Sequence, residues 1–160
     1  IMKDGEILQY DSPEQILRNP SNSFIEEFIG KNRLLKRPEF IKVKDIMIKD
    51  PVTIIPERTL TQALEKMRRQ KVDSLMVVNH LGKFIGLTTA NDVLENFDTA
   101  EKISEIVKTE VHYVGENSNL SQVLSIMAQK QVGYVPVIDE NNNLIGLVTR
   151  SSLVNVLGKA

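Results

Sequence analysis

Two eight-residue stretches decide how this chain folds: GLTTANDV at residues 86–93 and GLVTRSSL at residues 146–153. Each begins with a glycine, passes through a short apolar step to a threonine, and continues with helix-compatible residues. Each stretch therefore predicts a strand that turns directly into a helix. After the threonine they differ, because the first has Asp92 where the second has Ser152, and only the second has an arginine, Arg150. The chain thus contains the same type of turn twice, with differently charged residues after the threonine.

The two turns belong to a longer internal repeat. A shift of 60 positions places Val43–Phe97 on Ile103–Leu157 without a gap, over 55 aligned positions. The apolar residues agree along this alignment, for example Ile46 with Ile106, Leu60 with Leu120, Leu64 with Leu124, Met67 with Met127, Val72 with Val132 and Val77 with Val137. Such self-similarity indicates the duplication of one structural unit.

Each unit is predicted to have the order β-α-β-β-α. The first is expected to contain a short helix around Lys44–Ile48, strands at Val52–Ile55, Ser74–Val78 and Phe84–Thr88, and helices that follow Thr59 and Thr89. The later strands of the second unit are expected at Tyr134–Ile138 and Leu144–Val148. The fold class is therefore mixed α/β (α+β), with two repeats of 43–97 and 103–157 joined by a linker at 98–102.

The long helix of each unit carries a start signal. Thr59 and Gln62 have the spacing of a capping box, in which a hydroxyl and a glutamine side chain satisfy backbone N–H groups reciprocally. Asn119 and Gln122 repeat this spacing. Because a unit of this size buries only a modest fraction of its surface alone, we expect the two units to pack together with approximate two-fold symmetry and to form clefts between them.

Composition excludes several kinds of function. The formal net charge of -1 argues against binding a nucleic-acid polymer, which usually needs a basic face. The absence of cysteine excludes disulfides and thiolate metal sites. The apolar runs are a few residues long, whereas a membrane span needs about 20. His80 and His112, expected in a turn and a strand, have no second ligand at metal-binding spacing. The sequence shows no pattern of catalytic or metal-binding residues.

The repeat resembles a tandem pair of CBS domains, also called a Bateman module. The residues that carry the resemblance are Gly86–Asp92, which read G-h-h-T-x-x-D (h, apolar), and the strand Tyr134–Ile138, which reads Y-V-P-V-I and has Pro136-Val137 between apolar residues. The resemblance implies adenine-nucleotide binding in clefts between the repeats. It also implies that two modules pair as a homodimer and regulate an attached transporter or enzyme.

The first 30 residues carry a second resemblance. Ile1–Tyr10, Asp11–Leu17 and Phe24–Gly30 are similar to the end of the ATP-hydrolysing subunit of an ABC importer. With the CBS pair, this resembles importers of glycine betaine, carnitine and choline. The implied partner is a membrane permease subunit, and the implied location is the cytoplasmic face of the membrane. The GxxxxGK[ST] loop is not in this chain, so we expect the chain itself not to be an enzyme, whereas its parent is expected to be an ABC-type ATPase. Residues 31–42, which include a basic run, are expected to form a linker.

Arg150 is the candidate for contact with a phosphate. A cation in the first turn of a helix opposes the helix dipole, typically by about 0.3–1 kcal/mol when exposed, so an anion is expected nearby. That anion is either a phosphate of a ligand or a carboxylate of the protein. The serine at position 152 removes an acid from the same turn and makes the site more positive.

Five other residues are candidates for contact with an adenine base. Tyr134 is expected to stack on the purine, and Ser74 suits a base edge. Val72 and Val132 are expected to be apolar walls, and Leu147 a floor. The competing interpretation is that all five are ordinary strand and core residues.

Thr89 and Asp92 are candidates for a second cleft. The resemblance implies that they hydrogen-bond a ribose, and a helix N-terminus also favours phosphate. The competing interpretation is a helix cap, which explains both residues equally well.

Cyclic di-AMP is the ligand that these features favour. It has two phosphodiesters and no free ribose diol, which suits the exchange of an acid for Ser152 together with the gain of Arg150. The importers that this chain resembles in Gram-positive bacteria respond to it. Two alternatives stay open: AMP or ATP in the Thr89 and Asp92 cleft, and a module that binds no small molecule and acts by dimerisation or by sensing ionic strength.

Overall fold

The N-terminal segment starts with a two-stranded hairpin. In the computed structural model, which describes residues 1–12, 15–16, 19–25 and 37–157, strand β1 (Met2–Lys3) pairs antiparallel with β2 (Glu6–Ile7). Asp4 and Gly5 have φ angles of 52° and 86°. Two left-handed residues form the kind of turn whose twist matches that of the flanking strands. The N-terminal segment therefore begins with a tight hairpin.

Two similar halves follow this segment. The first half contains β4 (Thr53–Ile54), α4 (Leu60–Gln70), β5 (Ser74–Val78), β6 (Phe84–Thr89) and α5 (Ala90–Glu95). The second contains β7 (Val114–Gly115), α6 (Leu120–Lys130), β8 (Tyr134–Ile138), β9 (Leu144–Thr149) and α7 (Arg150–Leu157). Short elements precede each half: η1 (Pro38–Phe40), α3 (Val43–Ile46) and β3 (Ile48–Lys49) before the first, and η2 (Ile103–Glu105) before the second. The predicted mixed fold with two β-α-β-β-α repeats is confirmed.

The main local differences from the prediction lie in the short elements at the start of each repeat, while β6 and β9 each extend one residue beyond the predicted end. The short helix ends at Ile46, and Ile48 lies in strand β3 instead. The strand predicted at Val52–Ile55 spans only Thr53–Ile54. His112 precedes β7 and is not part of a strand. These short segments are positioned by long-range pairing, which local pattern does not report.

Capping boxes begin both long helices, as predicted. The Gln62 N–H donates to the Thr59 hydroxyl at 3.1 Å, and the Thr59 N–H donates to the Gln62 side chain at 3.0 Å. Asn119 and Gln122 make the corresponding bonds at 3.0 and 2.9 Å. These reciprocal bonds satisfy backbone groups that a helix start otherwise leaves open.

The segment before each half packs into the opposite half. Val43 of α3 is fully buried in the core of the second half, and Ile103 of η2 is fully buried in the core of the first. The backbone repeats the exchange, because the Val43 N–H donates to the Ser118 carbonyl at 2.8 Å and the Ile103 N–H donates to the Arg58 carbonyl at 2.9 Å. Each core is therefore completed by residues from the other repeat.

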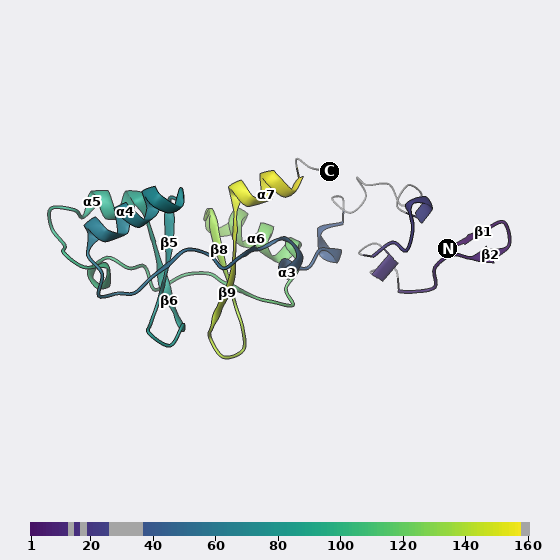
Figure 1. Cartoon of the computed structure of the whole chain (residues 1–160), viewed down its shortest axis with the longest axis horizontal. Coiled ribbons are helices and arrows are strands. Elements are labelled where there is room, and N and C mark those ends of the chain that lie inside the picture. Colours follow the sequence, from purple (N-terminus) through teal and green to yellow (C-terminus); the bar gives the residue numbers. More distant parts are fainter. Residues whose placement is uncertain (13–14, 17–18, 26–36, 158–160) are drawn as a thin grey trace.

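The sheets show the same exchange. One sheet has the order β4-β5-β6, and the other has the order β3-β9-β8-β7, in which β3 comes from the sequence of the first repeat. In Figure 1 the second half lies between the first half and the N-terminal segment. Helices α4, α5 and α7 lie along one edge of the view, and the tips of the two long hairpins lie along the other. The halves are thus interlocked.

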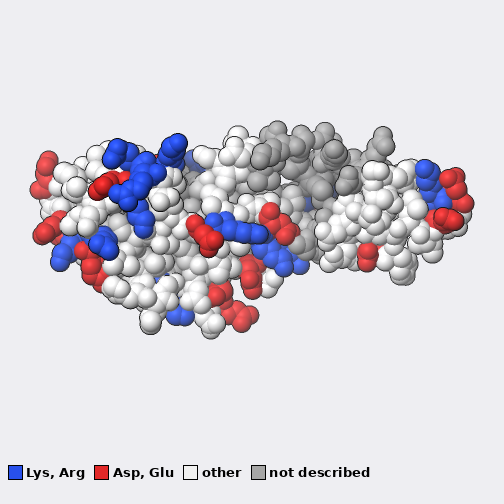
Figure 2. Space-filling model, viewed as in Figure 1, with Lys and Arg blue, Asp and Glu red and all other residues white. Residues whose placement is uncertain are grey.

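The inner faces of the two sheets meet in a small apolar cluster. Met76, Leu87 and Leu147 are buried together, and Tyr134 packs against them. Both charge signs are interspersed on the face shown in Figure 2, consistent with the net charge of -1. Among the described helices, none has the length and apolar character needed to cross a bilayer.

Candidate functional site

A cleft of about 830 Å³ lies between the two halves. Its walls come from the chain before β4, the start of β5, the start of β8 and the first turn of α7. Five of the six predicted ligand-binding residues line it: Val72, Ser74, Tyr134, Leu147 and Arg150. The pseudo-symmetry of the fold therefore brings together residues that lie up to 78 positions apart in sequence.

The structure corrects the placement of Val132. This residue is not among those that line the cleft, and it packs against the apolar core of the second half. The reason is the repeat itself, since Val132 has the position in the second half that Val72 has in the first. Val72 and Val132 therefore lie at two different locations that are related by the pseudo-symmetry. They do not form opposite walls of one cleft.

Tyr134 joins the apolar centre of the molecule to the polar part of the cleft. It is half-buried against Leu87 and Leu147, and its hydroxyl lies near the Asp73 carboxylate. Burial and the nearby carboxylate of Asp73 raise the pKa of the Tyr134 phenol to about 12. The ring is therefore uncharged at neutral pH and lies at the cleft wall, where a planar apolar surface is available to a base.

Arg150 begins α7 and has no carboxylate partner among the residues that the structure describes. Its backbone N–H donates to the Gly133 carbonyl at 3.1 Å. Its side-chain stem lies over Gly133, where a Cβ atom would be 3.8 Å from the arginine Cδ. Within the described part of the chain the exposed guanidinium thus opposes the helix dipole without an ion pair, which makes it available to an anion.

Ser152 takes over the capping role that Asp92 has in the first half. The Thr149 N–H donates to the Ser152 Oγ at 2.9 Å, and the Ser152 N–H donates to the Thr149 Oγ1 at 3.0 Å. The corresponding bonds between Thr89 and Asp92 measure 2.9 and 3.2 Å. The exchange of acid for serine therefore keeps the helix cap and removes a negative charge from the cleft that contains Arg150.

Asp92 is engaged by the protein itself. Its Oδ2 accepts from the Thr89 N–H and from the Thr89 hydroxyl, both at 2.9 Å. Its Oδ1 is 2.8 Å from the Nζ of Lys108. Burial raises the pKa of Asp92, but the bonds from Lys108 and Thr89 outweigh it and hold the pKa below its ordinary value of 3.8. Neither Thr89 nor Asp92 lines the 830 Å³ cleft.

Three charged residues of the cleft were not predicted. Asp50, Lys71 and Asp73 contribute to its walls together with the predicted set. Lys71 ends α4 with a left-handed φ of 56°, a conformation that also occurs at the matched Gln131. The sequence did contain one signal for Asp73. It directly precedes β5, and its matched residue Gly133 directly precedes β8, next to the predicted Tyr134.

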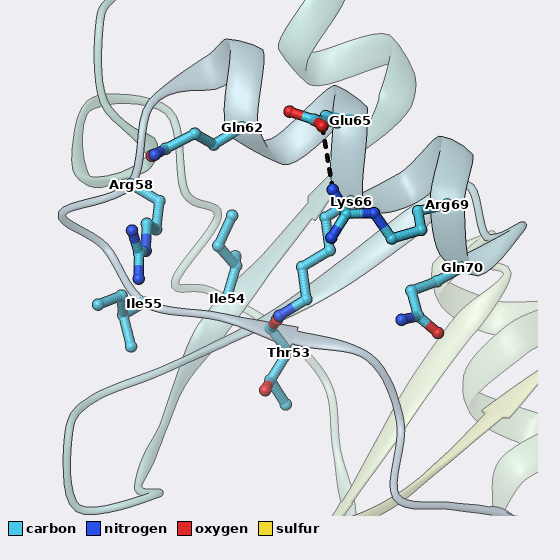
Figure 3. A pocket seen from close by; sticks show the side chains of 9 residues that line it. All are labelled: Thr53, Ile54, Ile55, Arg58, Gln62, Glu65, Lys66, Arg69 and Gln70. Atoms are coloured by element: carbon cyan, nitrogen blue, oxygen red, sulfur yellow. Dashed lines mark hydrogen bonds and ion pairs between the residues drawn. The ribbon is translucent and has the colours of Figure 1, made fainter.

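A second groove of about 450 Å³ lies beside α4 and β4 (Figure 3). It contains three cations, Arg58, Lys66 and Arg69. Lys66 donates to the Thr53 carbonyl, and Arg69 forms an ion pair with Glu65 at 3.0 Å. Because two of the three cations already have partners in the protein, this groove is a weaker site for an anion than the cleft at Arg150.

Comparison with known proteins supports the sequence resemblance. The profile of the family described as "CBS domain" matches residues 43–98 and 103–159. The chain is 39% identical over 158 residues to the carnitine transport ATP-binding protein OpuCA of Listeria monocytogenes, which covers 98% of this chain and 40% of the relative. It is also 39% identical to the glycine betaine/carnitine/choline transport ATP-binding protein OpuCA of Bacillus subtilis, covering 98% of this chain and 42% of that protein. The chain thus spans about two fifths of these relatives.

Solved structures show the same fold. Staphylococcus aureus OpuCA is 30% identical with a TM-score of 0.63, covering 72% of this chain and 97% of that one. The CBS domain pair of protein MJ0100, in complex with 5′-methylthioadenosine and S-adenosyl-L-methionine, is 25% identical with a TM-score of 0.69, covering 74% of this chain and 96% of that one. With a family match over both repeats and the interlocked fold described above, the chain belongs to the CBS domain family, of which it carries two domains in tandem.

Proposed function

We propose that this chain is the regulatory, adenine-nucleotide-binding module of an ABC importer of quaternary-ammonium osmoprotectants. The names of the OpuCA relatives, each similar over nearly the whole chain, support the transport part of the proposal. The parent protein is then an ABC-type ATPase that acts at the cytoplasmic face of the membrane with a permease subunit. The module contributes regulation and no catalytic residue.

The 830 Å³ cleft is the proposed nucleotide site. The related structure of protein MJ0100 holds two ligands that contain adenosine, and we extend the adenine preference to this chain. Tyr134 and Val72 are proposed to hold the purine between them, with Leu147 as the floor and Ser74 at the base edge. Val132, which lies outside the cleft, has no role in this site.

Cyclic di-AMP is the ligand that we propose for this cleft. The observation that carries the choice is the unpaired guanidinium of Arg150 in the first turn of α7, beside a capping serine in place of an acid. Such a site favours a phosphodiester, because a bidentate guanidinium matches two phosphate oxygens. It offers no carboxylate at the cap position for a free ribose diol.

The two-fold symmetry of cyclic di-AMP supports a homodimer of modules. Each half of the ligand can occupy an identical cleft, one in each copy, across the dimer axis. Binding then favours one arrangement of the two modules over others. We propose that this arrangement reduces uptake by acting on the ATPase through residues 31–42.

Calorimetric titration of the chain with cyclic di-AMP, AMP and ATP tests the ligand and the cleft together. Arg150→Ala is expected to weaken cyclic di-AMP binding by about 1.5–3 kcal/mol, the value of a lost hydrogen bond to a charged group. Tyr134→Ala is expected to weaken it as well, whereas Asp92→Ala leaves it nearly unchanged. A larger loss with Asp92→Ala than with Arg150→Ala would place the ligand at the other turn.

A second candidate function is dimerisation without a small ligand. Leu94 of α5 and Val154 of α7 are matched in the repeat and are 60% and 68% exposed, which suits a contact between copies. In this case ionic strength changes the dimerisation, and none of the adenine nucleotides binds at micromolar concentration. Sedimentation at several salt concentrations, run beside the titrations, separates the two candidates. AMP or ATP at Thr89 and Asp92 is the remaining alternative and gives the opposite ranking of variants.

A further inference from the structure

The turn at Thr89 and Asp92 differs from its counterpart at Thr149 and Ser152 in one further way. The chain that crosses each turn carries Lys108 in one case and Ile48 in the other, and these two positions match in the repeat. Both cross the opposing strand in the same manner: Ile48 pairs with Leu147 in β9, and Lys108 pairs with Leu87 in β6 through two backbone bonds of 3.0 Å. Acid and lysine are thus present together at one turn and absent together at the other.

The two oxygens of Asp92 have separate tasks. Oδ2 serves the helix cap, because it accepts both bonds from Thr89. Oδ1 is left over from the cap and is taken by the Nζ of Lys108 at 2.8 Å. The Asp92 side chain is only 12% exposed, so its remaining oxygen has little access to solvent. A hydroxyl of an incoming ligand therefore competes with the lysine for this oxygen.

We propose that Lys108 is a specificity-determining residue that blocks this turn against nucleotides with a free ribose diol. A carboxylate oxygen at a helix start is a natural acceptor for a diol, and the lysine occupies that oxygen from within the protein. The Lys108 side chain is 61% exposed, so the block is one of competition and not of steric closure. This inference rests on the proposed adenine-nucleotide function and adds which nucleotides the chain rejects.

The test replaces Lys108 by the residue that the repeat already uses at the matched position. Lys108→Ile keeps the backbone pairing with Leu87 and frees the Asp92 Oδ1. AMP affinity, measured by calorimetry, is expected to rise about two- to fivefold, the range of a weak ion pair that the ligand no longer has to displace. The dideoxy analogue 2′,3′-dideoxy-AMP, which lacks the diol, is expected to show no gain.

Three controls keep the outcome interpretable. Lys108→Arg retains the charge and is expected to show no gain, and Lys108→Ile combined with Asp92→Ser is expected to lose the gain. Lys108→Met serves if the isoleucine variant is unstable, and thermal unfolding of each variant is measured first. An unchanged or lower AMP affinity in both Lys108→Ile and Lys108→Met overturns the proposal, and the lower affinity would mark Lys108 as a phosphate ligand.

Cyclic di-AMP titrations of the same variants separate this inference from the proposed function. Lys108→Ile is expected to leave cyclic di-AMP affinity unchanged, because Lys108 lies outside the lining of the 830 Å³ cleft. If the parent chain fails to bind cyclic di-AMP while Lys108→Ile gains AMP binding, the proposed ligand is wrong and the block stands. If cyclic di-AMP binds through Arg150 while Lys108→Ile gains nothing, the ligand stands and the block is wrong.

Discussion

Single residues at the two strand-to-helix turns set the charge of each site while the cap is kept. A serine and an aspartate both satisfy the backbone N–H of the preceding threonine, at 2.9 Å in each case. The sequence pointed to Arg150 and to the loss of the acid, because the matched turns differ visibly there. It did not indicate the pairing of Asp92 with Lys108. That contact depends on a crossing segment from the other repeat, which no local spacing reports.

The ion pair of Asp92 makes stability depend on acid pH. Burial raises the Asp92 pKa, but bonds from Lys108 and Thr89 lower it below 3.8 overall. A carboxyl with a lowered folded pKa contributes stability above its unfolded value, and this is lost as pH falls through the folded value. The stability advantage of the parent chain over Asp92→Ser is therefore expected to be constant near neutral pH and to shrink below about pH 4. Urea unfolding of both proteins at pH 7, 5, 4 and 3 measures it, and an advantage that grows in acid contradicts the assignment.

Among the elements, the long helices and the long strands were predicted closely, whereas the two-residue strands were not. Helices α4 and α6 follow their apolar stripes and capping boxes, and β5 and β8 begin and end at the predicted residues. Strand β3 has only two residues, so it has no periodicity to read. Its place in the sheet is set by the partner strand β9.

Glycines mark the points where these crossing segments touch the strands. A Cβ at Gly86 would collide with the backbone carbonyl of Lys108, whereas one at Gly146 would mainly meet the Met47 side chain. Backbone cannot yield as a flexible methionine can, so Gly86→Ala is expected to destabilise the fold by about 3 kcal/mol and Gly146→Ala by about 1. Chemical denaturation compares the two. The combination of Gly146→Ala with Met47→Ala tests whether methionine is the obstacle, and equal losses for the single variants contradict this account.

At the scale of the whole molecule, the two repeats share their cores, because each core contains a residue from the other repeat. The alignment of the two repeats predicted two copies that pack together. It also implied that the short segment at the start of each repeat packs into the core of that same repeat. The structure instead exchanges these segments, with Val43 in the second core and Ile103 in the first. The alignment could not reveal this, because an exchanged and an unexchanged arrangement bury the same apolar positions.

The exchange predicts a single cooperative unfolding transition for residues 43–157. Val43→Ala is expected to cost roughly 2 kcal/mol and Ile103→Ala about 2–4 kcal/mol, as for truncation of other buried side chains. Each variant is expected to lower the stability of both halves together. Calorimetry and hydrogen exchange resolved by residue measure this. Protection lost in only one half, or two separate transitions, argues for independent domains.

The pairing of β3 with β9 also has a consequence for biosynthesis. Ile48 leaves the ribosome 99 residues before its partner Leu147. At about 5–20 residues per second, the nascent chain waits roughly 5–20 seconds for that partner. During this interval the first repeat and Ile103 are synthesised, so the first core can form, but α3 still lacks its neighbours in the second core. A chaperone that binds this module during translation is therefore expected to bind the stretch between Val43 and Lys49, and to release it once the last strand has been made.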